Sequence, residues 1–278
     1  MMLVISLYLV SPAGAYLFHE VGYIDQLLFL VLFISIATFK KYKIFSITLF
    51  SSSMLIHELA LFTTVPIFFT YLYLSTKNLK KSILYITPSL VLFLLVYMFF
   101  QTVPSDAIQL FKEKISNYSN YKFRNDFYTI FTNTFTGARN KLYYGINSLN
   151  QILLLAFLIS TTTLIIYRLS NKQIILSLLV FSTGLLPLTL GLFGWDLSRW
   201  YFLSLSSLTV VFVIILIHYR TTFTEIFSIQ STVILYFIFY ILLISNMHLR
   251  YFDGYKHRPM NLNSLKEVEK EFFRIPTR

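Results

Sequence analysis

The chain has 278 residues, of which 56% are hydrophobic and 13% are charged, and its formal net charge at pH 7 is +11. A mean hydropathy of +0.67 excludes an ordinary water-soluble domain, in which roughly a quarter of the residues are charged. The absence of cysteine excludes disulfides, thiolate catalysis and cysteine metal sites. The basic residues lie in short clusters between apolar runs, a distribution that is typical of membrane proteins and disfavours nucleic-acid binding.

Nine apolar stretches are predicted to be membrane-spanning helices. A span needs about 20 apolar residues, and shorter stretches are tolerated where neighbours shield them. The predicted spans are 2–18, 25–39, 44–56, 59–75, 82–100, 148–167, 174–193, 201–218 and 229–245. The stretch 44–75 is compatible with one long helix, a pair of short helices or a re-entrant hairpin. The expected fold is therefore an all-α, polytopic transmembrane helix bundle that forms one domain over residues 1–278, with the N-terminal MMLVISLYLV in the first span because it lacks the basic region of a signal peptide.

Short basic clusters predict the orientation of the spans. The clusters on either side of the stretch 44–75 are Lys40, Lys41 and Lys43, and Lys77, Lys80 and Lys81. If both are cytoplasmic, the chain must leave and return between them. The outer segments are then 19–26, 101–147, 194–200 and 246–278. Together with the outer turn at His57 and Glu58, these segments hold eleven of the twelve acidic residues.

The bias toward Ile, Phe, Tyr, Lys and Asn is typical of AT-rich bacterial genomes, so we expect a multi-pass protein of the bacterial inner (cytoplasmic) membrane.

Two outer segments are long enough to fold over a site. The large outer (periplasmic) loop 101–147, between the fifth and sixth spans, mixes charge, Asn and aromatic residues, which favours short interfacial helices. In the outer C-terminal tail 246–278, Ser264 and Glu267 form a capping box that predicts a short amphipathic helix.

The first candidate site is the pair His57-Glu58, which lies at the predicted outer turn and is followed by Pro66 in the next apolar run. An ionisable pair near membrane depth is costly to keep and is a functional candidate by default. Glu58 can act as a general base or hold a cation, while His57 orients it or binds an anionic headgroup. The alternative is that the pair caps a tight turn exposed to water.

The second candidate is the polar segment 194–200, which lies between strongly apolar spans. If the segment is helical, Asp196 and Arg199 are at i and i+3 and can pair as structural glue, with Trp195 and Trp200 as interface anchors. Alternatively, Arg199 binds a phosphate or diphosphate through its planar fork, and Asp196 positions that fork.

The outer loops and the tail carry the remaining candidates. The cationic ones are Lys122, Arg124, Arg139, Lys141, Arg250, Lys256 and Arg258. Such a set is a solvated face or a contact with anionic lipid headgroups, but Arg124 and Arg139 stand among aromatic and small polar residues, as a groove for sugar and phosphate requires. In the first outer loop, Asp25 stands at the entrance of a span, where an idle carboxylate is also tolerated.

Several chemistries lack their motifs in this sequence. It has no Walker loop, HExxH, Gly-x-Ser-x-Gly elbow or dinucleotide fingerprint, so we expect neither nucleotide hydrolysis nor redox chemistry, and no cofactor or metal. A His-Glu turn before a proline-containing span, an outer loop with arginines and an Asp-x-x-Arg segment near a late span resemble the Wzy-like polymerases and related polytopic membrane glycosyltransferases of bacterial capsule and O-antigen synthesis. The resemblance covers about residues 12–245, and those proteins are usually longer, with more spans.

The resemblance implies an enzyme, a glycosyltransferase of the polysaccharide polymerase type, that joins polyprenyl-diphosphate-linked glycan units at the outer leaflet. Arginines would neutralise the leaving diphosphate, and a carboxylate would deprotonate the attacking sugar hydroxyl. The implied catalytic residues are Glu58, His57 and Asp196, and the implied substrate-binding residues are Arg199, Arg124, Arg139 and Asp25. The expected partners are the lipid-linked glycan, membrane lipids and other membrane proteins of polysaccharide assembly, without nucleic acid.

Two other functions fit the same residues. A GT-C-type glycosyltransferase that uses a polyprenyl-phosphate sugar also works at the outer face and usually has a carboxylate in its first outer loop, for which Asp25 or Glu20 is the candidate. A transporter or flippase of a lipid-linked glycan places ionisable residues at the midplane and shows repeats or broken helices, whereas the charges here cluster at span ends. The first alternative is tested by whether substitution of Asp25 or of Glu58 abolishes activity. The second is tested by whether the purified protein moves a labelled lipid between leaflets without changing the mass of that lipid.

Overall fold

The computed structural model describes Tyr8 and residues 24–100, 105–118, 149–170, 173–192 and 197–219. No strand occurs in these ranges, and helices account for nearly all of them, which confirms the predicted all-α class. The chain divides into two compact units, Met1–Met247 and His248–Arg278, and every described residue belongs to the first. The predicted spans 2–18 (apart from Tyr8) and 229–245 and the predicted helix of the tail lie outside the described residues.

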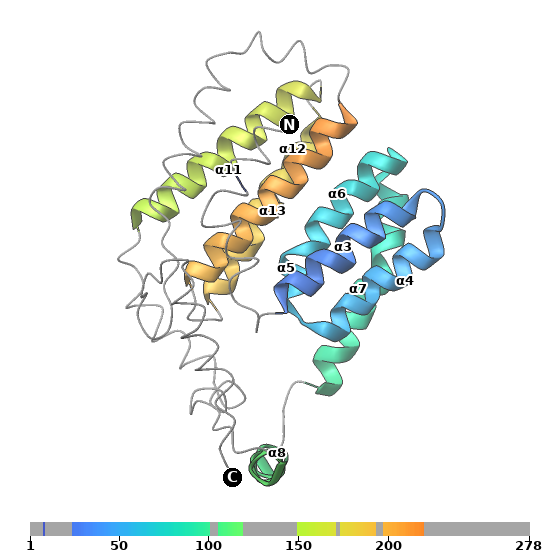
Figure 1. Ribbon diagram of the computed structural model, residues 1–278. Helices are drawn as coiled ribbons and strands as arrows, with labels where there is room; N and C mark the ends of the chain where they lie inside the picture. Colours follow the sequence, from blue (N-terminus) through green and yellow to red (C-terminus); the bar gives the residue numbers. More distant parts are fainter. Residues whose placement is uncertain are drawn as a thin grey trace, which may run out of the picture. The chain divides into compact units, whose positions relative to one another are not determined.

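The first group of helices covers residues 25–100 (Figure 1). It consists of α3 (Asp25–Phe39), α4 (Lys43–Ile56), α5 (Leu59–Phe62), α6 (Thr64–Thr76) and α7 (Leu79–Phe100). The stretch 44–75 is therefore not one long helix, because α4 ends at Ile56 and a second break at Thr63 separates α5 from α6. α4 packs against α3 and α7, and α6 packs against α3 and α7.

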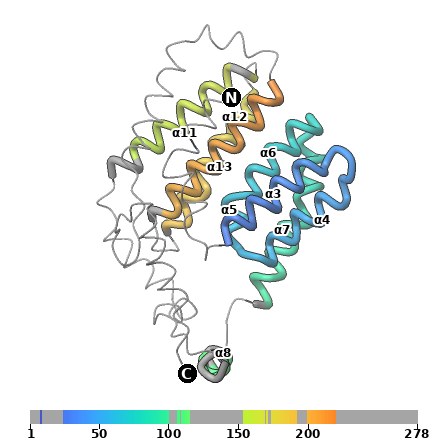
Figure 2. Tube along the Cα trace, in the orientation of Figure 1, coloured from blue at the N-terminus to red at the C-terminus, as the bar shows by residue number. Residues whose placement is uncertain are grey.

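The second group follows the outer loop and contains α11 (Leu149–Leu169), α12 (Ile174–Thr189) and α13 (Leu197–His218). A short 3-10 helix, Leu190–Leu192, extends α12. α12 packs against both α11 and α13, and α6 of the first group packs against α12 and α13 (Figure 2). The apolar part of α13 is 78% buried, whereas that of α7 is only 17% buried.

Two of the described helices are long and apolar enough to cross a membrane, with candidate spans at Leu79–Phe99 in α7 and Arg199–His218 in α13. The apolar stretches of the other described helices are shorter, and in α11 the stretch is Leu153–Arg168. A helix of 16 residues such as α12 is about 24 Å long, whereas the hydrocarbon core is about 30 Å thick. The count of nine spans thus stays a prediction.

The predicted outer loop 101–147 contains a helix among its described residues. α8 (Ser105–Tyr118) carries Asp106 in its first turn, and the side chains of Leu110 and Phe111 are exposed. The rest of the loop, 101–104 and 119–147, lies outside the described residues, and so do the cationic side chains predicted in 119–147.

Hydroxyl groups and one glycine join the helices in their buried contacts. Ser46 Oγ donates to the Ser35 carbonyl oxygen over 2.7 Å and links α4 to α3. Ser51 Oγ and Ser89 Oγ lie 3.0 Å apart between α4 and α7. In the second group, the Gly184 carbonyl oxygen of α12 accepts a hydrogen bond from Ser204 Oγ of α13. Such small residues allow close helix packing where burial of apolar surface gives little net gain.

Candidate functional site

Asp25 and Arg199 form a bidentate ion pair between the first turns of α3 and α13. Arg199 Nε donates to Asp25 Oδ2 over 3.0 Å, and Arg199 Nη2 donates to Asp25 Oδ1 over 2.9 Å. The two residues are 174 positions apart in the chain. The contact therefore joins the two groups of helices at the end where α3 and α13 begin.

The ion pair is buried: 1% of the Asp25 side chain and 12% of the Arg199 side chain are exposed. A buried carboxylate requires a charged, hydrogen-bonded partner, and the two parallel hydrogen bonds supply one. The Arg199 Cζ also lies 5.3 Å from the ring centroid of Trp200, which is itself buried. Asp25 and Trp200 thus fix the orientation of the guanidinium.

His57 and Glu58 lie in the break between α4 and α5, as predicted. The Nδ1 atom of His57 is 3.1 Å from Glu58 Oε2 and 3.2 Å from the Leu59 amide nitrogen. A protonated Nδ1 donates to the carboxylate, whereas an unprotonated Nδ1 accepts from the Leu59 amide. The side chain of Glu58 is 69% exposed and that of His57 is 26% exposed, so the carboxylate is accessible from outside the protein.

The pKa of the Glu58 carboxyl depends on its partner His57 and, more weakly, on Arg199 of the other ion pair. The hydrogen bond from His57 lowers the pKa of the Glu58 carboxyl, and the positive charge of Arg199 acts in the same direction. Glu58 is therefore ionised at neutral pH. Arg199, which is held by Asp25, is the weakest of the influences that lower this pKa. We call the four residues at these helix ends the Arg199 cluster: Asp25, His57, Glu58 and Arg199.

Four of the predicted site residues are thus brought together, and three are not described. Asp196, predicted as the residue that positions Arg199, lies outside the described residues, as do Arg124 and Arg139. The described partner of Arg199 is Asp25, which the sequence had marked only as a separate candidate. Its position in the first turn of a helix that starts on the same predicted side was the available signal.

The Arg199 cluster can position charge and accept a proton. Among the described residues no group of three or more His, Asp or Glu side chains could hold a metal ion. The accessible carboxylate of Glu58 stands beside an imidazole, and the buried guanidinium supplies fixed positive charge. In comparisons with protein-family models, curated proteins and solved structures, nothing matches this chain.

Proposed function

We propose that the chain is a multi-pass protein of the bacterial cytoplasmic membrane. Support comes from apolar side chains on the surface of the helices, which lipid would cover. On α7 alone, Leu84, Leu94, Met98 and Phe99 expose between 54% and 72% of their surface. The basic turn residues lie at one end of the helices, and the acidic members of the Arg199 cluster lie at the other end.

We further propose that the protein is a glycosyltransferase that joins polyprenyl-diphosphate-linked glycan units at the outer leaflet. The observation that supports it best is the Arg199 cluster, in which an accessible, ionised carboxylate lies within the electrostatic reach of a buried arginine. This pairing suits a reaction in which a hydroxyl is deprotonated while negative charge grows on a leaving diphosphate.

In the proposed reaction, Glu58 accepts the proton of the acceptor hydroxyl as its oxygen bonds to the anomeric carbon of the donor. The bond between that carbon and the diphosphate oxygen breaks, and the polyprenyl diphosphate leaves with the electron pair. His57 orients the Glu58 carboxylate. Arg124 and Arg139 of the predicted outer loop offset the charge of the diphosphate, and Arg199, whose charge is shared with Asp25, adds a weaker positive field.

The geometry favours Glu58 over Asp25 as the base. Both carboxylate oxygens of Asp25 accept hydrogen bonds from Arg199, and the side chain is almost fully buried. The Glu58 carboxylate is largely exposed. This difference argues against the GT-C-type reading in which Asp25 is the base, and the position of the ionisable residues at helix ends argues against a transporter.

Deletion of the gene tests the proposed class of reaction. Surface polysaccharide is separated by size, and lipid-linked intermediates are weighed by mass spectrometry. We expect single complete repeat units to accumulate while long chains disappear. Incomplete units would instead indicate a single-sugar transferase, and an unchanged profile would reject both enzyme functions.

Substitution of the base tests the site. We expect Glu58→Gln to lower the rate of polymer formation by about 100-fold or more, as removal of a general base does, in protein present at the wild-type level. Glu113→Gln is the matched control, because Glu113 is a carboxylate of α8 on the same predicted side and lies outside the Arg199 cluster. Equal polymer length and amount in the two variants would reject Glu58 as the base.

A further inference from the structure

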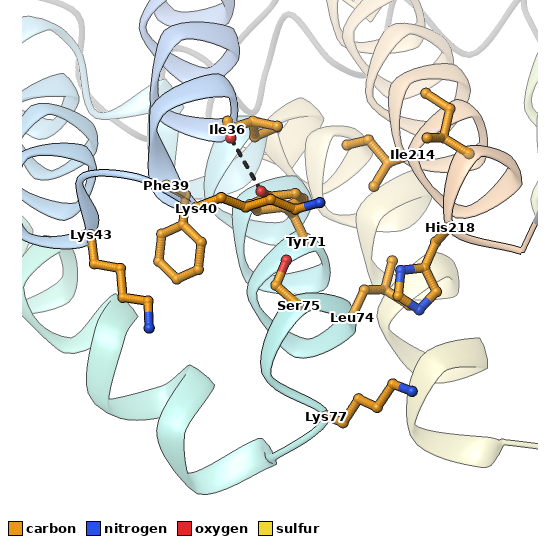
Figure 3. A pocket seen from close by; sticks show the side chains of 11 residues that line it. Ile36, Phe39, Lys40, Lys43, Tyr71, Leu74, Ser75, Lys77, Ile214 and His218 are labelled. Carbon is orange, nitrogen blue, oxygen red and sulfur yellow. Dashed lines mark hydrogen bonds between the residues drawn. The ribbon is translucent and has the colours of Figure 1, made fainter.

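A basic pocket of about 570 Å³ lies at the ends of α3, α6 and α13, opposite to the Arg199 cluster (Figure 3). Its lining residues come from the last turns of these helices and from the start of α4. α3 alone has 15 residues, which corresponds to about 22 Å of helix. The basic pocket is therefore separated from the Arg199 cluster by most of the thickness of the helix bundle.

Three lysines give the pocket its positive charge, and a histidine lines it beside them. They are Lys40, Lys43, Lys77 and His218. None of the described residues that line the pocket is acidic, and none of the three lysines forms an ion pair with a described carboxylate. Ammonium groups that line one cavity repel each other, and an anion in the cavity would relieve that repulsion.

Lys77 occupies a backbone position that favours glycine. Its φ of 50° and ψ of 25° are left-handed, and it is the only non-glycine residue with positive φ in the described ranges. A left-handed residue with a side chain costs about 1–2 kcal/mol. The following residue, Asn78, caps α7 through Oδ1, which accepts from the Lys81 amide over 3.1 Å. The strained residue thus presents a lysine to the pocket from a fixed turn.

The other lining residues make one side of the pocket apolar. Ile36, Leu74, Ile214 and Ile217 line it together with the ring of Tyr71. The Tyr71 hydroxyl donates to the Ile36 carbonyl oxygen over 3.1 Å, and this bond is drawn in Figure 3. A cavity with cationic groups and apolar walls matches a ligand with an anionic head and a hydrocarbon part. Its volume lies within the range of about 300–1,000 Å³ that ligand pockets have.

We propose that the basic pocket binds the phosphate group of an anionic amphiphile. On the predicted cytoplasmic side of the membrane, basic pockets between helices take the headgroups of anionic phospholipids. A free phosphate presents the same chemistry to the lysines, and the experiment separates the two sources. The proposal concerns the end of the bundle away from the transferase site and does not depend on the transferase reaction.

The test measures lipid retention by the purified full chain. Native mass spectrometry counts the molecules of phosphatidylglycerol or phosphatidylcholine that remain bound, with and without inorganic phosphate. The pocket variant is Lys40→Gln/Lys43→Gln/Lys77→Gly, and the control variant is Lys41→Gln/Lys80→Gln/Lys81→Gln. Both variants lose three positive charges from the same predicted side, but the control lysines do not line the pocket.

We expect the wild type and the control variant to retain phosphatidylglycerol in preference to phosphatidylcholine, and the pocket variant to bind it at least about tenfold more weakly, since each lysine near an anionic surface contributes roughly fivefold. Retention that millimolar phosphate does not displace assigns the pocket to the lipid, and displacement assigns it to a small phosphate. Equal weakening in both variants would show general surface attraction and overturn the proposal, as would no preference in the wild type.

The single variant Lys77→Gly keeps the test valid if the triple variant does not fold. Glycine fits the left-handed position without strain, so the turn should persist while one ammonium is lost. We expect weaker retention of phosphatidylglycerol by about fivefold with an unchanged or higher melting temperature. Unchanged retention in Lys77→Gly would overturn the assignment of Lys77.

Discussion

The Asp25–Arg199 pair combines a structural task and an electrostatic one in a single contact. Both side chains are buried and each satisfies the charge of the other, so removal of one leaves an uncompensated charge. The same guanidinium acts on Glu58. A substitution of either residue therefore changes both stability and the proposed site, and the two effects must be measured separately.

We expect Asp25→Asn to destabilise the protein by about 3–5 kcal/mol, because it leaves a buried, unpaired guanidinium. The double variant Asp25→Leu/Arg199→Leu should recover much of that loss, since two apolar residues leave no buried charge. Unfolding in detergent, followed by intrinsic fluorescence, measures both. If the double variant is as unstable as Asp25→Asn, the pair contributes more than charge compensation. If it is stable but inactive, the charge of Arg199 is needed in the reaction.

The pH profile of the proposed reaction should depend on His57. The carboxyl of Glu58 has a pKa below its ordinary value of 4.5, with His57 as the main cause. Its ionised form therefore predominates above pH 4.5 and is lost as the pH falls through the lowered value. In His57→Gln the pKa should rise, so the acid limb of the activity profile should move to higher pH. An unmoved limb would show that another group sets it.

At the scale of the helices, α11, α12 and α13 meet closely at Gly184. A Cβ atom at this position would lie 2.7 Å from Ile159 Cγ1 of α11, while the Gly184 carbonyl oxygen accepts the hydrogen bond from Ser204 of α13. The glycine therefore sets the spacing of α12 against two neighbours. Since α13 carries Arg199 at its first turn, this spacing also affects the position of the guanidinium.

We expect Gly184→Ala to destabilise the bundle by about 1–3 kcal/mol through overpacking. Adding Ile159→Ala, which removes the clashing atoms, should restore part of the loss. Leu178→Ala is the control on the same helix, because the Leu178 side chain is 61% exposed. Melting temperatures in detergent provide the measurement. If Ile159→Ala does not improve Gly184→Ala, the contact between α11 and α12 is not the cause.

For the whole chain, the orientation of the helices can be tested by cysteine labelling, because the sequence contains no cysteine of its own. Ile24 and Lys80 are exposed residues at opposite helix ends. We expect a membrane-impermeant maleimide to label Ile24→Cys in intact cells and to label Lys80→Cys only after the membrane is opened. Labelling of both variants in intact cells would reject the proposed alternation of the spans.

The sequence predicts where the described helices begin and end, but it does not predict which helices pack against each other. The apolar runs 25–39 and 44–56 are bounded by charges, so their helices were predicted closely, and the balance of lysines placed the break at His57-Glu58. The pairing of Asp25 with Arg199 depends on which helices are adjacent. A single sequence carries no signal for a contact across 174 positions.

The basic pocket was missed for a related reason. Its lysines explain the topology of the chain completely, so nothing in the sequence required a second role for them. Their convergence depends on α3, α6 and α13 ending at the same level, and on the left-handed conformation of Lys77. These are properties of packed helices and of one backbone turn.

The long separation of Asp25 from Arg199 also has a consequence for synthesis of the protein. At about 5–20 residues per second, a ribosome adds Arg199 roughly 10–35 s after Asp25, over the 174 intervening positions. During that interval the carboxylate of α3 has not yet met the guanidinium that neutralises it in the finished protein. A nascent chain that stops before α13 lacks this counter-charge, so the ion pair can close only after α13 has been made.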